Sequence, residues 1–188
     1  MNELEIWENF KQGSEHDYSI LYRKYAPILF KYGCKITQDR DLIKDSVQQV
    51  FFRIWKSRES ISTPLSVKNY LLKALRCEVV KKLTDKNTCV SLPDDYHYHL
   101  TDSYESDLIH SQTAEQLQEK FKKLLSQLPD RQREVIFLKY FTNLSYPEIA
   151  GIMGIEQESV YKLTYKALDK LQQLFLKVSL VLGFLLLL

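Results

Sequence analysis

The sequence predicts an all-α protein with two helical domains joined by a flexible acidic linker. Three observations support this prediction. Only 5 Gly and 5 Pro occur among 188 residues, so long stretches contain no helix breaker. Apolar residues recur at helical spacing in both halves of the chain. Between the halves, residues 84–112 carry one basic against six acidic residues and show no helical periodicity, which is typical of a linker.

Composition excludes several classes of protein. Hydrophobic residues make up 45% and charged residues 27% of the chain, as in globular proteins with a core. Three cysteines without CxxC spacing predict neither a disulfide framework nor a zinc site. His97 and His99 have no further ligand at useful spacing, so no metal ion or cofactor is expected. The N-terminus, MNELEIWENFKQG, lacks the basic and apolar segments of a secretion signal, so we expect a cytoplasmic protein.

Capping signals mark the helix starts in the first half. Ser14, with Asp17 three residues later, predicts a helix from residue 15. Pro27 within it implies a kink or a break into two helices. Asp39 is expected to cap the next helix, over residues 40–58. The apolar stripe of that helix comprises Ile43, Val47, Val50, Phe51, Ile54 and Trp55, and its opposite face carries Asp45, Gln48, Gln49 and Arg53.

A third helix, over residues 66–83, carries a polar stripe. Asn69, Lys73 and Arg76 follow at i, i+4 and i+7 on one side, beside Tyr70. Without other evidence, such a stripe is more often a solvated helix face. Cys77 on this helix is expected to be a small apolar filler.

Two further helices are predicted at the start of the second half. Thr113 and Gln116 form a possible capping box for a helix over residues 114–128. Pro129 is placed in the first turn of the following helix, over residues 129–141.

The stretch SYPEIAGIMGIEQESV, residues 145–160, holds two helix signals close together. Ser145 and Glu148 form a capping box. Ala150 allows a close helix crossing, Gly154 permits a positive φ at the corner, and Val160 fills the angle. This spacing is typical of a helix-turn-helix, which places its second helix in a groove of DNA.

The last helix divides into two faces by helical spacing. The predicted core stripe is Val160, Leu163, Thr164, Ala167, Leu168 and Leu171. The predicted outward face is Tyr161, Lys162, Tyr165, Lys166 and Asp169. Hydroxyl, ammonium and aromatic groups on that face suit phosphates and base edges.

Two motifs resemble those of the extracytoplasmic-function sigma factors, small members of the sigma-70 family. DLIKDSVQQVFFRIWKSRESI followed by SVKNYLLKALR resembles the sigma-2 domain, and LPDRQREVIFLKYFTNLSYPEIAGIMGIEQESVYKLTYKALDKL is similar to the sigma-4 domain. Their occurrence together, in this order, is more specific than either motif alone. The resemblance implies a sigma-2 domain over residues 1–83, a linker over 84–112 and a sigma-4 domain over 113–174. An apolar tail over residues 175–188 lies outside the clear resemblance.

The resemblance also implies a role for each polar face. The family binds the clamp helices of the polymerase β′ subunit through residues that here are Asp45, Gln48, Gln49 and Arg53. The melted minus-ten strand falls on Asn69, Tyr70, Lys73 and Arg76. The minus-thirty-five duplex falls on Gln157, Tyr161, Lys162, Tyr165 and Lys166. Cys77 stands where the family usually has Asn.

The implied function is that of an alternative sigma factor, which is not an enzyme and directs core RNA polymerase to specific promoters. The implied partners are the β and β′ subunits of core polymerase, promoter DNA and an anti-sigma factor, which in this family is often membrane-bound. One alternative is a helix-turn-helix regulator that does not join the polymerase. Another is a membrane-associated protein dominated by its apolar tail. The eleven residues after Lys177 would reach about 16 Å as a helix, against roughly 30 Å of hydrocarbon, so no membrane span is expected.

Overall fold

The computed structural model describes residues 3–86 and 123–185, and these contain helices and no strand. The all-α prediction is confirmed. The first described part forms α1 (Glu3–Lys11), α2 (Glu15–Ile36), α3 (Arg40–Lys56) and α4 (Val67–Lys86). The second forms α6 (Asp130–Ile136), the π-helix η1 (Phe137–Phe141), α7 (Tyr146–Met153) and α8 (Gln157–Leu185). Linker residues 87–112, with His97 and His99, and the predicted capping box of Thr113 and Gln116 lie outside the described residues.

The N-terminal helices begin where the sequence predicts. The side chain of Ser14 accepts a hydrogen bond from the Asp17 backbone N–H (3.2 Å), and Asp39 accepts one from the Leu42 N–H (2.9 Å). Each bond satisfies a backbone donor that the first helical turn leaves unpaired. Helices α2, α3 and α4 pack against one another, and α1 packs on α2.

The predicted stripe of α3 forms the centre of this core. Five of its six members are buried, whereas Trp55 is only partly buried and packs against Tyr18. The expectation for Cys77 was wrong, because its side chain is exposed. The buried side of α4 is instead formed by Leu71, Leu72, Leu75 and Val79.

Pro27 does not break its helix, since α2 runs through it without interruption. Proline removes the hydrogen bond to the carbonyl four residues earlier, which here belongs to Arg23. Both residues are exposed, so water can satisfy that carbonyl. Burial of Leu21, Tyr25 and Leu29 along the other side holds the two halves of the helix together.

The helix-turn-helix corner is also confirmed. The Glu148 carboxylate accepts hydrogen bonds from the Ser145 N–H (2.7 Å) and hydroxyl (2.6 Å). Gly154 ends α7 at φ 64°, a left-handed conformation that costs glycine little. Val160 is fully buried in the angle.

Three details of the C-terminal helices differ from the predictions. Pro129 caps α6 from the position before the helix, not from within its first turn, a shift of one residue that is common at helix ends. The predicted helix over 129–141 changes to π-helix after Ile136. Leu168 is 40% exposed, because it lies one position around the helix from the buried Ala167 and off the packed side of α8.

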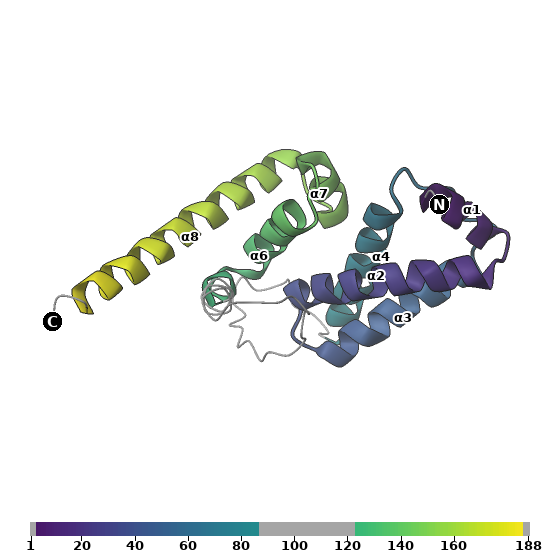
Figure 1. Cartoon of the computed structure of the whole chain (residues 1–188), viewed down its shortest axis with the longest axis horizontal. Helices are drawn as coiled ribbons and strands as arrows, with labels where there is room; N and C mark the ends of the chain where they lie inside the picture. Colours follow the sequence, from purple (N-terminus) through teal and green to yellow (C-terminus); the bar gives the residue numbers. More distant parts are fainter. Residues whose placement is uncertain (1–2, 87–122, 186–188) are drawn as a thin grey trace, which may run out of the picture.

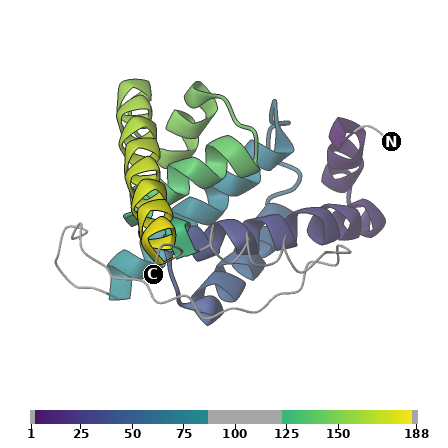
Figure 2. The ribbon, with the colours of Figure 1, turned by 60° about the vertical axis from the view of Figure 1, so that its left-hand side comes forward.

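The N-terminal and C-terminal helices also contact each other, which the sequence did not predict. Helix α6 packs on α2, and α7 packs on α4. Figures 1 and 2 agree in placing α6 and α7 between α8 and the N-terminal helices. In Figure 1, α8 extends away from the rest of the described chain.

One tight contact in the core gives a testable prediction. A Cβ added to Gly33 of α2 would stand 2.5 Å from Ile43 Cγ2, and Ile43 is a stiff, fully buried side chain. We expect Gly33→Ala to lower the free energy of unfolding by about 1–3 kcal/mol, the usual cost of overpacking.

Gly151→Ala is the matched control for this substitution. Gly151 also lies within a helix, but an added Cβ would meet nothing within 4 Å. Its replacement should be neutral or stabilising by up to about 1 kcal/mol. Urea denaturation measures both changes, and equal effects of the two substitutions would contradict the packing argument.

Candidate functional site

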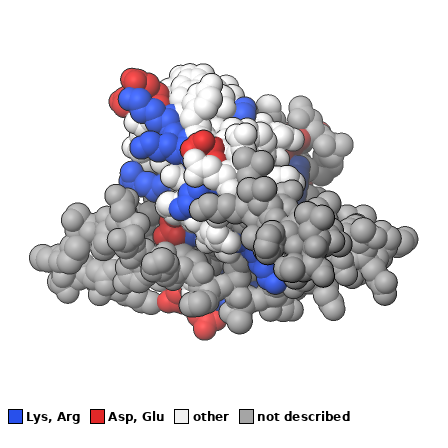
Figure 3. All heavy atoms as spheres, turned by 90° about the vertical axis from the view of Figure 1, so that its left-hand side faces the viewer, with Lys and Arg blue, Asp and Glu red and all other residues white. Residues whose placement is uncertain are grey.

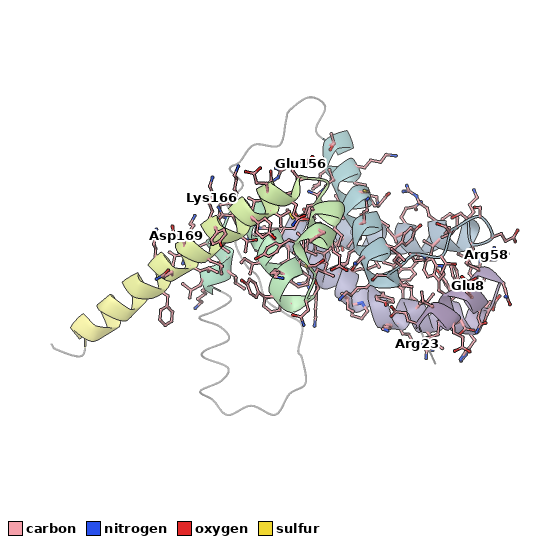
Figure 4. All side chains as sticks on the ribbon, turned by 90° about the horizontal axis from the view of Figure 1, so that it is seen from above. Glu8, Arg23, Arg58, Glu156, Lys166 and Asp169 are labelled. Atoms are coloured by element: carbon pink, nitrogen blue, oxygen red, sulfur yellow. The ribbon has the colours of Figure 1, made fainter. Side chains whose placement is uncertain are left out.

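The outward face of α8 is exposed as predicted. Gln157, Tyr161, Lys162, Tyr165 and Lys166 are all solvent-accessible, and Tyr165 is the most open of the aromatic ones at 73%. Figure 4 shows Glu156, just before α8, in a row with Lys166 and Asp169 along one edge of the helix. In Figure 3, Lys and Arg side chains gather along one side of the face seen from the α8 end.

Contacts with α7 and within α8 order this face. The Tyr161 ring packs on the Tyr146 ring at 4.2 Å between centroids, and Lys139 lies over Tyr146 at 4.5 Å. Burial and the neighbouring tyrosine hydroxyls raise the pKa of Tyr146. The Gln157 amide donates to the Tyr161 hydroxyl (3.3 Å). Tyr161 is therefore held in a fixed position on the exposed face of α8.

The two lysines of this face differ in their surroundings. Lys162 forms an exposed ion pair with Glu158 at 2.8 Å. A phosphate must compete with that carboxylate for the Lys162 ammonium group. Lys166, one turn further along, is the better candidate for a direct phosphate contact.

The polar face of α3 surrounds an open hollow. Its lining residues are Asp45, Gln48, Gln49, Phe52 and Lys82. Phe52 is 58% exposed, and the sequence analysis did not identify it. Phe52 follows Gln48 by four residues, which places both on the same helix face. This spacing could have identified Phe52 from the sequence. An exposed aromatic ring among amides is typical of a protein-binding surface.

Arg53 has a different position from the other predicted polymerase-binding residues. Its guanidinium forms an ion pair with the buried Glu78 of α4 at 2.6 Å. This contact ties α3 to α4, so Arg53 has a structural role whether or not it also meets a partner.

The predicted minus-ten residues do not form one solvated stripe. Lys73 is exposed, whereas Asn69 and Arg76 are partly buried against the C-terminal helices. The Asn69 amide donates to Glu148 of α7 (2.7 Å), and the Arg76 Nε donates to Glu134 of α6 (2.8 Å).

Tyr70 packs against α1. Its ring meets the ring of Trp7 edge-on at 5.6 Å. Burial raises the pKa of the Tyr70 hydroxyl. Tyr70 is therefore partly a packing residue that joins α4 to α1.

Glu134 stands at the centre of the contact between the two sets of helices. Besides the Arg76 guanidinium it accepts a hydrogen bond from the buried Tyr32 hydroxyl (2.6 Å). Burial and the adjacent carboxylate raise the pKa of Tyr32 well above its ordinary value. Burial lowers the pKa of Arg76, but the charge and hydrogen bond of Glu134, together with Tyr32 and Cys77, outweigh burial, so the net shift of the pKa is upward. The sequence analysis missed Glu134 because nothing local marks a partner 58 residues away.

In the described part of the chain, no group of three His, Cys, Asp or Glu residues could hold a metal ion. Within residues 3–86 and 123–185, no helix combines the length and apolar content that a membrane span requires.

Comparison with known families matches both halves of the chain. Residues 21–88 match sigma-70 region 2, and residues 118–171 match sigma-70 region 4. The extracytoplasmic-function RNA polymerase sigma factor SigM of Bacillus subtilis is 24% identical over 156 residues, covering 82% of this chain and 93% of SigM. The RNA polymerase sigma factor SigZ of the same organism is 22% identical over 174 residues, covering 93% of this chain and 87% of SigZ.

Solved structures show the same fold. CnrH in complex with the cytosolic domain of CnrY superposes with a TM-score of 0.62 at 16% identity, covering 92% of this chain and 96% of CnrH. RpoE of Bartonella quintana, in complex with the anti-sigma factor NepR, superposes with a TM-score of 0.57 at 23% identity, covering 85% of this chain and 96% of RpoE.

A helix-turn-helix regulator that acts without polymerase is not favoured, because region 2 accompanies region 4 in the same chain. The chain belongs to the sigma-70 family of transcription initiation factors. Within that family it is an extracytoplasmic-function sigma factor, an alternative RNA polymerase sigma factor.

Proposed function

We propose that this sigma factor divides its work among three helix faces. The α3 face, with Gln48 and Gln49 at its centre, binds the clamp helices of polymerase β′. The α4 face, with Lys73 and Arg76, holds the melted minus-ten strand. The α8 face, with Tyr165 and Lys166, reads the minus-thirty-five duplex. The domains are residues 1–83 and 113–174, with the linker 84–112 between them and the tail 175–188 beyond.

The observation that carries this proposal is the exposed face of α8 beside an ordered helix-turn-helix corner. Two phenol hydroxyls, an amide and two ammonium groups project from one side of α8, whose other side is packed on α6 and α7. That geometry lets a helix enter the major groove while its domain remains outside. Aromatic and apolar atoms can meet thymine methyl groups there, and the cations meet phosphates.

Promoter opening by this factor uses binding energy and no covalent step of its own, so the factor is not an enzyme. Unpaired bases and their phosphates bind to α4 only after the duplex melts, which favours the melted state. The site of action is the cytoplasm, where core polymerase and DNA are found.

An anti-sigma factor is the remaining proposed partner. RpoE of Bartonella quintana was solved with the anti-sigma factor NepR, and this chain shares its fold. The α3 hollow, with Phe52 exposed at its edge, is a surface that such a partner can cover in competition with polymerase.

Purified core polymerase provides the main test of the proposed function. The full chain should form a stable complex with core polymerase and support initiation from specific promoters. A chain that binds promoter DNA but never associates with core polymerase would contradict the proposal.

Replacement of both Gln48 and Gln49 by Lys should weaken the complex with core polymerase about tenfold. Gln48 is exposed and Gln49 partly so, so the fold should tolerate the change, while two buried charges at an interface would be costly. Fluorescence titration with labelled core polymerase measures the affinity.

Gln172→Lys with Gln173→Lys is the matched control, because these exposed neighbours on α8 gain the same charge away from α3. The control should retain the affinity of the unmodified chain. Equal weakening by both pairs would indicate a general charge effect and refute the α3 assignment.

A further inference from the structure

A stack of three side chains links the recognition helix α8 to two other segments of its domain. The Lys139 ammonium of η1 lies 4.5 Å from the centre of the Tyr146 ring of α7. The Tyr146 ring in turn lies 4.2 Å, centre to centre, from the Tyr161 ring of α8. Rings this close are in direct contact, and the cation is within range of a favourable interaction with the ring. The tyrosine stack, Lys139, Tyr146 and Tyr161, therefore joins η1, α7 and α8.

The Tyr146 end of the stack is positioned by contacts outside α8. Tyr146 is the first residue of α7 and directly follows Ser145, whose N–H and hydroxyl donate to Glu148 in the capping box. The Lys139 ammonium also donates to the carbonyl of Leu144 (3.2 Å), in the loop that leads into α7. The cap and this bond fix the backbone on which the Tyr146 ring is carried.

The two tyrosines of the α8 face differ in how firmly they are held. Tyr161 is 38% exposed and also receives a hydrogen bond from Gln157, whereas Tyr165, one turn further along, is 73% exposed. A ring that is already ordered gives up less conformational entropy when a ligand covers it. The contact of Tyr161 with DNA therefore gains from the support that Tyr146 provides.

We infer that Tyr146 is a positioning residue for recognition of the minus-thirty-five element: it holds the Tyr161 ring in the orientation that meets the base edges, and does not have to touch DNA itself. The inference rests on the proposed function of α8. It extends the determinants of promoter specificity from the recognition helix to α7 and η1.

A double-mutant cycle tests whether Tyr146 acts through Tyr161. A residue that acts only through the Tyr161 ring has no effect on specificity once that ring is removed. The cycle comprises Tyr146→Leu, Tyr161→Leu and the double variant. Tyr146→Phe keeps the ring and serves as the conservative replacement.

Two further variants complete the set. Lys139→Gln removes the cation, while its amide can still donate to the Leu144 carbonyl. Phe141→Leu is the matched control, because Phe141 is a 57% exposed residue of the same domain whose ring stacks on Phe137 and not on α8. It loses a stacked aromatic ring outside the tyrosine stack.

The measured quantity is the discrimination ratio of the holoenzyme. Core polymerase with each full-length variant is titrated with a labelled duplex of a promoter that the factor uses, and with the same duplex after its minus-thirty-five element has been scrambled. The ratio of the two affinities is compared among variants. Loss of a phosphate contact weakens both duplexes alike and leaves the ratio unchanged. Circular dichroism checks that each variant is folded.

Tyr161→Leu should lower the discrimination ratio about tenfold, as for the loss of one base contact. Tyr146→Leu should lower it about threefold to tenfold, as for the loss of one aromatic pair, and the double variant should be no worse than Tyr161→Leu. Lys139→Gln should lower it about twofold. Tyr146→Phe and Phe141→Leu should keep the ratio of the unmodified factor.

Contrary outcomes separate the inference from the proposed function. A normal ratio in Tyr146→Leu, together with a reduced ratio in Tyr161→Leu, overturns the inference and leaves the reading of DNA by α8 standing. Additive losses in the double variant show that Tyr146 contacts DNA by itself, which also overturns the positioning role. If Tyr161→Leu and Lys166→Ala both keep a normal ratio, the α8 assignment fails and the inference fails with it. Should Tyr146→Leu not fold, the same cycle with Lys139→Gln in its place decides between these outcomes.

Discussion

Replacing Lys73 and Arg76 together by Ala should reduce initiation from a closed promoter about a hundredfold. The proposed function gives each of these cations one contact with the melted minus-ten strand. A hydrogen bond to a charged group contributes about 1.5–3 kcal/mol. Two such losses amount to at least about 3 kcal/mol, or two factors of ten in rate. Abortive initiation assays on a linear promoter template measure the change.

A template premelted over the minus-ten region should restore part of the lost initiation activity. Melting no longer has to be driven by binding of the unpaired strand, although the phosphate contacts are still missing. Lys166→Ala on α8 should gain nothing specific from the bubble, because its proposed contact is with upstream duplex. Equal rescue of the two variants would refute the division of work between α4 and α8.

Lys73→Ala alone separates the DNA contact from the contact between domains. Lys73 is exposed, whereas Arg76 is bound to Glu134. Loss of Arg76 therefore also removes the bond to Glu134, whereas loss of Lys73 leaves that bond in place. The single Lys73 variant should show a smaller defect with the same response to premelting.

The second large effect is expected on the recognition helix. Lys166→Ala should weaken promoter use by about 1–3 kcal/mol, the value of one good contact to a base or phosphate. Lys162→Ala should cost less, since Glu158 already holds the Lys162 ammonium at 2.8 Å. Transcription from a natural promoter is compared with transcription from the same template after its minus-thirty-five element has been scrambled.

On the scrambled template the difference between Lys166→Ala and the unmodified factor should shrink. If the variant loses the same activity on both templates, α8 does not read that element. A larger defect for Lys162→Ala than for Lys166→Ala would contradict the role assigned to the Glu158 ion pair.

Features encoded within a few residues could be predicted from the sequence. The caps at Ser14 and Asp39, the capping box at Ser145 and the left-handed corner at Gly154 all follow from neighbouring side chains and backbone groups. The outward face of α8 follows from helical spacing alone, as does the buried stripe of α3. The occurrence of motifs that resemble region 2 and region 4 in one chain then identified the family.

Features that depend on distant partners could not be predicted in the same way. Glu134 lies in an ordinary helical stretch, and only the packing of α6 on α2 brings it to Tyr32, 102 residues away in sequence. Asn69 and Arg76 have helical spacing that suits a solvated face equally well. Pro27 was expected to kink or break its helix, but burial of side chains along the other side of α2 keeps the helix continuous.

The distribution of indole rings gives the two domains different optical signatures. Both tryptophans of the chain, Trp7 and Trp55, lie in the N-terminal helices, where they flank Phe10. Tryptophan emission therefore reports unfolding of that domain alone, while far-ultraviolet circular dichroism reports the helices of both. The interval between the two transitions during denaturation is a direct measure of how strongly the domains depend on each other. Coincident transitions mean that the halves unfold as one cooperative unit, and separated transitions mean that they unfold independently.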